Sequence, residues 1–243
     1  MKFFASGNGF SKQQKESLKV YALIFLVCFI TWLCGIFFLR NKPEYRIFGL
    51  SGILLVLSGF VLVPLQKAAG FPDLLDREVT GRKRFVEPFV IGIIFAIADV
   101  IVFKLILHPE PYTSLPPFLQ PFPYSLLLYF SGAVYCEVLY RLLPLTLILT
   151  LISLFTRGKG AGRYFWILAV LTSLWEPLEQ TGNALPWVMG YTFLSGLFFN
   201  FLQAVYYRKA GFLSSLSVRL GHYFLWHILL GIYVQQSLMA GNT

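Results

Sequence analysis

Long apolar stretches separated by short polar ones recur along the whole chain. A helix needs about 20 mostly apolar residues to cross the hydrocarbon core of a bilayer. Stretches near that length occupy residues 20–39, 47–65, 88–107, 122–156, 164–178, 185–206 and 212–238. The pattern predicts an all-α fold, a polytopic membrane bundle of seven to eight transmembrane helices.

Composition supports the same class of fold. Of the 243 residues, 57% are hydrophobic and only 13% are charged, which is about half the charged share of a soluble domain. We expect residues 1–19 to form a cytoplasmic N-terminal segment and residues 20–240 to form one transmembrane bundle, with no room for a second soluble domain.

The stretch 122–156 is too long for one simple crossing of a bilayer core about 30 Å thick. Ser131-Gly132 and Pro144 are the expected break points, because glycine and proline weaken a helix interior. The sequence therefore predicts a broken or kinked helix pair here, a short half-helix followed by the helix that carries the run CEVLYR.

Basic residues are concentrated in short loops. The chain has 20 Lys and Arg against 11 Asp and Glu, a formal charge of +9. Cytoplasmic loops of membrane proteins carry such an excess of cations, so the distribution predicts an N-terminus in the cytoplasm. The short N-terminal segment and the compact chain favour the plasma membrane of a prokaryote. We therefore expect the basic residues to lie at the surface of the lipid bilayer, and we expect no nucleic-acid partner. The loop RNKPEYR, residues 40–46, opposes this topology because its three basic residues would face outward.

Ionisable side chains within the apolar stretches are the candidate functional residues. A charge at the bilayer centre costs about 3 kcal/mol or more, so it survives by pairing or by lining a hydrated cavity. Glu137 and Arg141 are four residues apart, the spacing of an intrahelical ion pair, which is either structural or part of a site. The other polar candidates are Asp99, Glu176, Glu179, Asn200, Gln203, Arg219, His222 and His227.

Two of these groups have competing interpretations. Glu176 and Glu179 flank Pro177 and lie either at a wet outer interface or in a site. His222 and His227 are five residues apart, about 140° around a straight helix, so one metal ion is not expected to take both. Asp99 has no partner that the sequence reveals.

Three polar motifs, in this order on successive apolar stretches, resemble those of the CPBP family. These are the CAAX-protease and bacteriocin-processing membrane proteins, also called Abi or type II CAAX prenyl endopeptidase-like proteins, with the motifs EExxxR, FxxxH and HxxxN. The first motif falls on CEVLYR, where Cys136 replaces the first Glu, and the second on WEPLE, where Glu179 replaces the His. The resemblance covers residues 122–230.

The third motif has two registers. The segment FNFLQAVYYRKAGFLSSLSV resembles the family's approach to this motif. Counting from Gly211 places Arg219 at the family His and Tyr223 at the Asn, whereas a shift of three residues places His222 and Trp226 there.

The resemblance implies an intramembrane endopeptidase that hydrolyses a peptide bond near the membrane surface with a carboxylate-activated water. The substrate would be a peptide or a membrane protein, and the cofactor a divalent metal or none. The expected catalytic residues are Glu137, Arg141, Glu179 and His222, supported by Cys136, Glu176, Arg219, Tyr223, His227 and Asn200.

The departure at Cys136 leaves other functions open. A thiol cannot replace the carboxylate base. Three alternatives follow: Glu137 or Glu179 serves as the base, Cys136 acts as a nucleophile beside a histidine, or hydrolysis is lost. Loss of hydrolysis would leave a CPBP-like scaffold that binds a membrane partner. A proton-coupled transporter is a third hypothesis, against which stands the absence of a repeated half in the sequence.

Overall fold

The computed structural model describes residues 11–157, 160–180 and 184–241, and within them every regular element is helical. The α-helices are α1 (Lys12–Cys34), α2 (Leu50–Leu65), α3 (Glu87–Asp99), α4 (Tyr124–Glu137), α5 (Leu143–Thr156), α6 (Ala161–Gln180), α7 (Pro186–Ala210), α8 (Phe212–Tyr223) and α9 (Leu230–Gly241). Five π-helical segments adjoin them, at Gly35–Leu39, Arg82–Val86, Val100–Ile106, Val138–Leu142 and Phe224–Leu229. The all-α prediction is confirmed.

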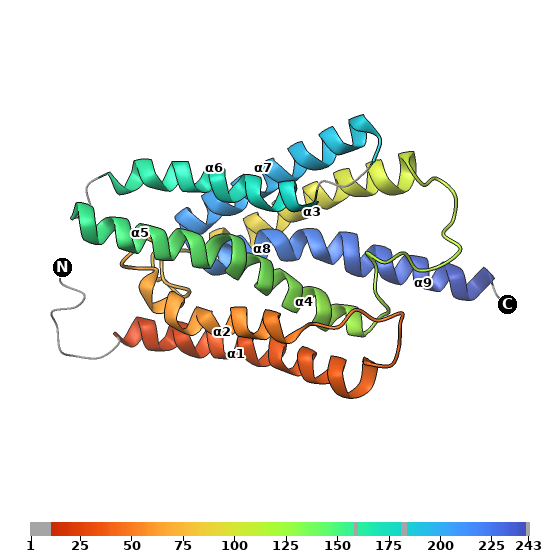
Figure 1. Ribbon diagram of the computed structural model, residues 1–243, viewed down its shortest axis with the longest axis horizontal. Helices are drawn as coiled ribbons and strands as arrows, with labels where there is room; N and C mark the ends of the chain where they lie inside the picture. The colour runs from red at the N-terminus through yellow and green to blue at the C-terminus, as the bar shows by residue number, and fades with distance from the viewer. Residues whose placement is uncertain (1–10, 158–159, 181–183, 242–243) are drawn as a thin grey trace.

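Because the π-helical segments continue their neighbours, the described elements form seven rods, packed side by side (Figure 1). Four of them are long and apolar enough to cross a bilayer, and α2 is a shorter apolar helix. The four are Lys12–Leu39, Arg82–Ile106, Tyr124–Thr156 and Pro186–Ala210. By length and composition the chain is thus a multi-pass membrane bundle, with four candidate spans where the sequence predicted seven to eight.

The bundle has an apolar exterior and polar groups inside. Large hydrophobic side chains such as Phe37, Val61 and Phe155 are exposed, whereas Gln203, Glu137 and Arg141 are fully buried. A soluble protein has the opposite distribution, so this arrangement fits a bilayer as the solvent. The start of α1 and the end of α9 lie at opposite ends of the bundle (Figure 1).

The stretch 122–156 is not divided into two separate helices, although its hydrogen bonding changes between α4 and α5. Tyr124–Thr156 is one continuous rod, in which the hydrogen bonding becomes π-helical over Val138–Leu142, just before Pro144. Pro144 has no N–H to offer the carbonyl of Tyr140, four residues earlier, and the π-turn accommodates this loss without a break. At the other expected break point, the Ser131 hydroxyl is 2.8 Å from the Thr31 hydroxyl of α1 and ties the rod to its neighbour.

Helices α3 and α8 are in backbone contact through two glycines. A Cβ atom at Gly92 would overlap the carbonyl oxygen of Val218, and one at Gly221 would overlap the carbonyl oxygen of Phe89. Only glycine permits so close an approach at this crossing. The contact places Asp99, at the end of α3, beside His222 of α8.

Candidate functional site

A network of four buried charged side chains occupies the centre of the bundle. They are Glu137 at the end of α4, Arg141 in the π-turn after it, Glu176 of α6 and Arg219 of α8, and none is more than 5% exposed. Two carboxylates and two guanidinium groups sum to zero charge. A neutral, hydrogen-bonded set is the arrangement in which charges survive burial.

Arg219 joins the two carboxylates of this network. Its Nε donates to Glu137 Oε1 at 2.9 Å. Its Nη1 and Nη2 donate to the two oxygens of Glu176 at 2.8 and 2.6 Å. This bidentate geometry is the strongest form of an arginine–carboxylate pair, so Arg219 ties α8 to both α4 and α6.

Glu137 is fully hydrogen-bonded without Arg141. Besides Arg219, it accepts a bond of 2.7 Å from Gln203 Nε2 and another from the Ser215 hydroxyl. Within the described chain its ion pair is with Arg219 and not with Arg141. The intrahelical pair predicted from the i, i+4 spacing is therefore absent, because the π-turn over Val138–Leu142 alters the rotation between the two positions.

Arg141 instead bonds to backbone carbonyls and side-chain amides. It donates to the carbonyl oxygens of Tyr140 and Asn200, each at 2.8 Å. It also donates to the side-chain oxygens of Asn200 and Gln203. The Tyr140 carbonyl is available because Pro144 lacks the N–H that would otherwise take it. Arg141 thus satisfies a free carbonyl of its own helix and fastens that helix to α7.

The two glutamates that flank Pro177 point in different directions. Glu176 enters the central network, whereas Glu179 is exposed at the end of α6. The Glu179 carboxylate accepts bonds of 2.6 Å from the Tyr140 hydroxyl and from Trp175 Nε1. An interfacial position thus fits Glu179 alone, and no described contact joins it to His222.

Asp99 has two partners, both remote in sequence. His222 Nε2 lies 2.6 Å from Asp99 Oδ2, and the Tyr191 hydroxyl donates to Oδ1 at 2.7 Å. The second ring nitrogen of His222, Nδ1, is buried and has no hydrogen-bond partner within the described residues. Sequence reasoning missed this pairing, since the partners lie on separate helices up to 123 positions apart.

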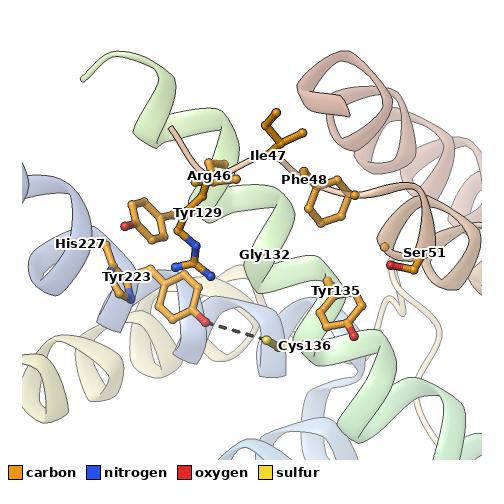
Figure 2. A pocket seen from close by; sticks show the side chains of 13 residues that line it. Arg46, Ile47, Phe48, Ser51, Tyr129, Gly132, Tyr135, Cys136, Tyr223 and His227 are labelled. Atoms are coloured by element: carbon orange, nitrogen blue, oxygen red, sulfur yellow. Dashed lines mark hydrogen bonds between the residues drawn. The ribbon is translucent and has the colours of Figure 1, made fainter. Parts of the chain in front are cut away.

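Two cavities adjoin the central network. The larger, about 580 Å³, is lined by Asp99, His222, Glu176 and other residues of α3, α6, α7 and α8. The smaller, about 330 Å³, is lined mainly by residues 46–52 and by α4, including Cys136 (Figure 2). Arg46, Tyr223 and His227 line both cavities and stand between them.

The shared wall is aromatic. The Tyr223 hydroxyl lies 3.9 Å from Cys136 Sγ (Figure 2). The ring of His227 stacks on Tyr129 with centroids 4.1 Å apart, and its Nδ1 lies 2.8 Å from the Phe118 carbonyl. Cys136 therefore faces Tyr223, the residue that the first register of the third motif selects, rather than a histidine.

Arg46 is a site residue that the sequence analysis did not single out. Its guanidinium lies among Tyr129, Tyr223 and His227 (Figure 2). The sequence did give an indication of Arg46, because the basic residues of the loop RNKPEYR oppose the predicted topology. Arg46 is the last residue of this loop, and its side chain points toward the bundle.

The resemblance implies a divalent metal or none. No group of three or more His, Cys, Asp or Glu in the described ranges is arranged to hold a metal ion. Glu179, at one of the family's imidazole positions, faces away from the central network. In the first register of the third motif the other position carries Arg219, whose cationic side chain has no lone pair to donate.

No protein-family model, curated protein or solved structure matches the chain. The likeness of residues 122–230 to the CPBP family is carried by the motifs alone.

Proposed function

We propose that the protein is a CPBP-like membrane scaffold that binds a peptide or membrane-protein partner without hydrolysing it. In this proposal all seven rods cross the plasma membrane of a prokaryote, with the N-terminus in the cytoplasm. Alternation of the rods puts loops 40–49 and 107–123 on the same side. That placement is supported by the bond of 2.6 Å from the Arg46 backbone N–H to the Gln120 side chain.

The double ion pair of Arg219 is the observation that carries the proposal. A general base needs a lone pair within reach of a water molecule. Arg219, which the first register of the third motif places at a family histidine, is a permanent cation and engages the carboxylates of Glu137 and Glu176. Cys136 stands where the family has its first glutamate. The ion pairs with Arg219 oppose proton uptake by either carboxylate, which disfavours both as the base that activates water.

The larger cavity supports partner binding. Its volume of about 580 Å³ is within the range of roughly 300–1,000 Å³ typical of ligand sites. It borders the central network through Glu176, Asn200 and Arg219, so the network forms a rigid wall for whatever enters.

The test is a cleavage assay on the purified protein with a library of membrane peptides. We expect no cleavage by the wild type. A photocrosslinking side chain at Thr192, in the wall of the larger cavity, should capture a membrane partner, whereas one at Gly190, which lines neither cavity, should not. Cleavage by the wild type that His222→Gln abolishes would contradict the scaffold.

We propose an intramembrane endopeptidase as the second candidate, on a different observation. Asp99 holds His222 by one ring nitrogen and leaves the other without a partner. A carboxylate that orients an imidazole is the arrangement of a general base in hydrolases. In that case Asp99→Asn and His222→Gln abolish cleavage, and Glu179→Gln, outside the cavity, serves as the matched control.

A further inference from the structure

Arg46 differs from the other arginines that face the interior. Its backbone is held on both sides, by Gln120 and by the Tyr124 hydroxyl, which lies 3.1 Å from the Arg46 carbonyl oxygen. Its guanidinium has neither a carboxylate within 4.0 Å nor a hydrogen-bond acceptor among the described residues. The chain thus fixes the backbone that carries this cation, and the described residues supply no anion to it.

The surroundings of Arg46 favour an anionic ligand. Aromatic and apolar walls have a low dielectric constant, so the attraction between the guanidinium and an anion in the cavity is much stronger than in water. The planar guanidinium group matches phosphate and carboxylate oxygens in pairs.

The smaller cavity also has an apolar part. Ile47, Phe48 and Leu128 line it beside Gly132. A Cβ atom at Gly132 would meet nothing within 4 Å, which shows free space along that face of α4. Exposed Leu50 directly follows Gly49 and precedes Ser51, which both line the cavity, so we infer that the cavity adjoins the apolar exterior of the bundle.

The size of the cavity selects the kind of ligand. At about 330 Å³ it lies at the low end of the roughly 300–1,000 Å³ typical of ligand sites. A single extended hydrocarbon chain with a small head group suits a cavity of this size. The apolar wall suits such a chain, and Arg46 suits an anionic head.

We propose that the smaller cavity binds an anionic lipid, with its phosphate on Arg46 and an acyl chain along Gly132. This site is distinct from the proposed partner site in the larger cavity, although the two share Arg46, Tyr223 and His227. The lipid is either a bilayer phospholipid or a free single-chain phosphate.

Binding of dodecyl phosphate to the full chain in an uncharged detergent, followed by native mass spectrometry, tests the proposal. Arg46→Gln should weaken binding about tenfold or more, because it removes a charge-assisted hydrogen-bonded pair. Lys42→Gln is the matched control: it removes a cation from the same loop that lies over the Tyr45 ring and outside both cavities. It should leave binding within about twofold.

A second pair of variants tests the acyl-chain part. Gly132→Phe should fill the cavity and abolish binding with Arg46 intact. Gly190→Phe adds the same side chain at another glycine whose Cβ direction is open, and it should bind like the wild type. Equal binding by both phenylalanine variants, or equal loss in the two loop variants, would overturn the proposal.

Further arms separate the sources of the ligand. Phosphatidylcholine vesicles with and without phosphatidylglycerol report a bilayer phospholipid, and dodecyl phosphate alone reports a free single-chain ligand. Stronger competition by a peptide with a free C-terminal carboxylate than by either lipid would refute the lipid class. Because these measurements report on the smaller cavity, whereas the scaffold's partner is proposed for the larger one, their failure leaves the proposed scaffold function standing.

Discussion

Arg219 and Arg46 face the interior of the same bundle under opposite conditions. Arg219 is buried and donates three hydrogen bonds, one to the carboxylate of Glu137 and two to that of Glu176. Arg46 is exposed to two cavities and has no such partner among the described residues. The first cation is part of the architecture, because its removal strands charges. The second is available for an external anion.

Replacement of Arg219 should have the largest effect. Arg219→Met leaves the carboxylates of Glu137 and Glu176 buried without their shared cation, which costs about 3–5 kcal/mol. Thermal unfolding in detergent measures the loss. The matched control is Arg82→Met, which removes an exposed arginine paired with Glu87 at 3.1 Å and should cost under about 1 kcal/mol. Similar losses in the two variants would remove the distinction between structural and available cations.

Arg141→Leu should be the next most damaging change, and worse than Glu137→Gln. The leucine leaves the acceptors on Tyr140, Asn200 and Gln203 unsatisfied and the network negative, at about 2–4 kcal/mol. Glutamine at 137 still hydrogen-bonds to its neighbours, and Arg219 keeps Glu176, so its cost is about 1–3 kcal/mol. The yield of folded protein from membranes compares the two, and equal yields would contradict the ranking.

The next smaller effect is expected for Tyr191→Phe, which changes the hydrogen bonding of Asp99. It removes one of the two side-chain hydrogen bonds to Asp99 and leaves His222 in place, so the loss should be about 1 kcal/mol. The control is Tyr233→Phe, on an exposed ring of α9, which should be neutral. If Tyr191→Phe destabilises the protein no more than Tyr233→Phe does, Asp99 does not depend on this bond.

The smallest effect concerns a carboxylate outside the spans. Asp73 is buried in the loop 66–81, and this burial raises the pKa of its carboxyl, opposed by Lys67 at 3.9 Å. A raised folded-state pKa adds stability at low pH that is lost as the pH rises through that pKa. The melting temperature of Asp73→Asn should therefore equal that of the wild type near pH 4 and be slightly higher than that of the wild type near pH 7. A melting temperature below that of the wild type at pH 7 would contradict the burial effect.

Local patterns predicted much of the fold. Apolar stretches located all seven rods, because length and hydropathy are local properties. The helix continues through Ser131-Gly132, one of the expected break points, and Ser131 there hydrogen-bonds to Thr31 of α1, a contact that the sequence does not reveal. At Pro144 the chain forms a π-turn instead of a break. No residue type in the sequence predicts a π-turn.

The site was less predictable, since its pairings are long-range. The inventory of charged residues identified Glu137, Arg141, Glu176 and Arg219, which do meet. Their pairing was not available from spacing, because it depends on how α4, α6, α7 and α8 pack. Only the inconsistent charge of the loop at 40–46 pointed toward Arg46.

The long-range partners of the α4–α5 rod have a consequence for how the protein is made. Glu137 contacts Gln203, Ser215 and Arg219, which follow it by 66, 78 and 82 residues. While a ribosome extends the chain, the rod is finished before any of these exists. In that interval Glu137 lacks the three donors that bind it in the finished bundle. Its hydrogen bonding is therefore completed only after α7 and α8 have been made and have packed against the rod.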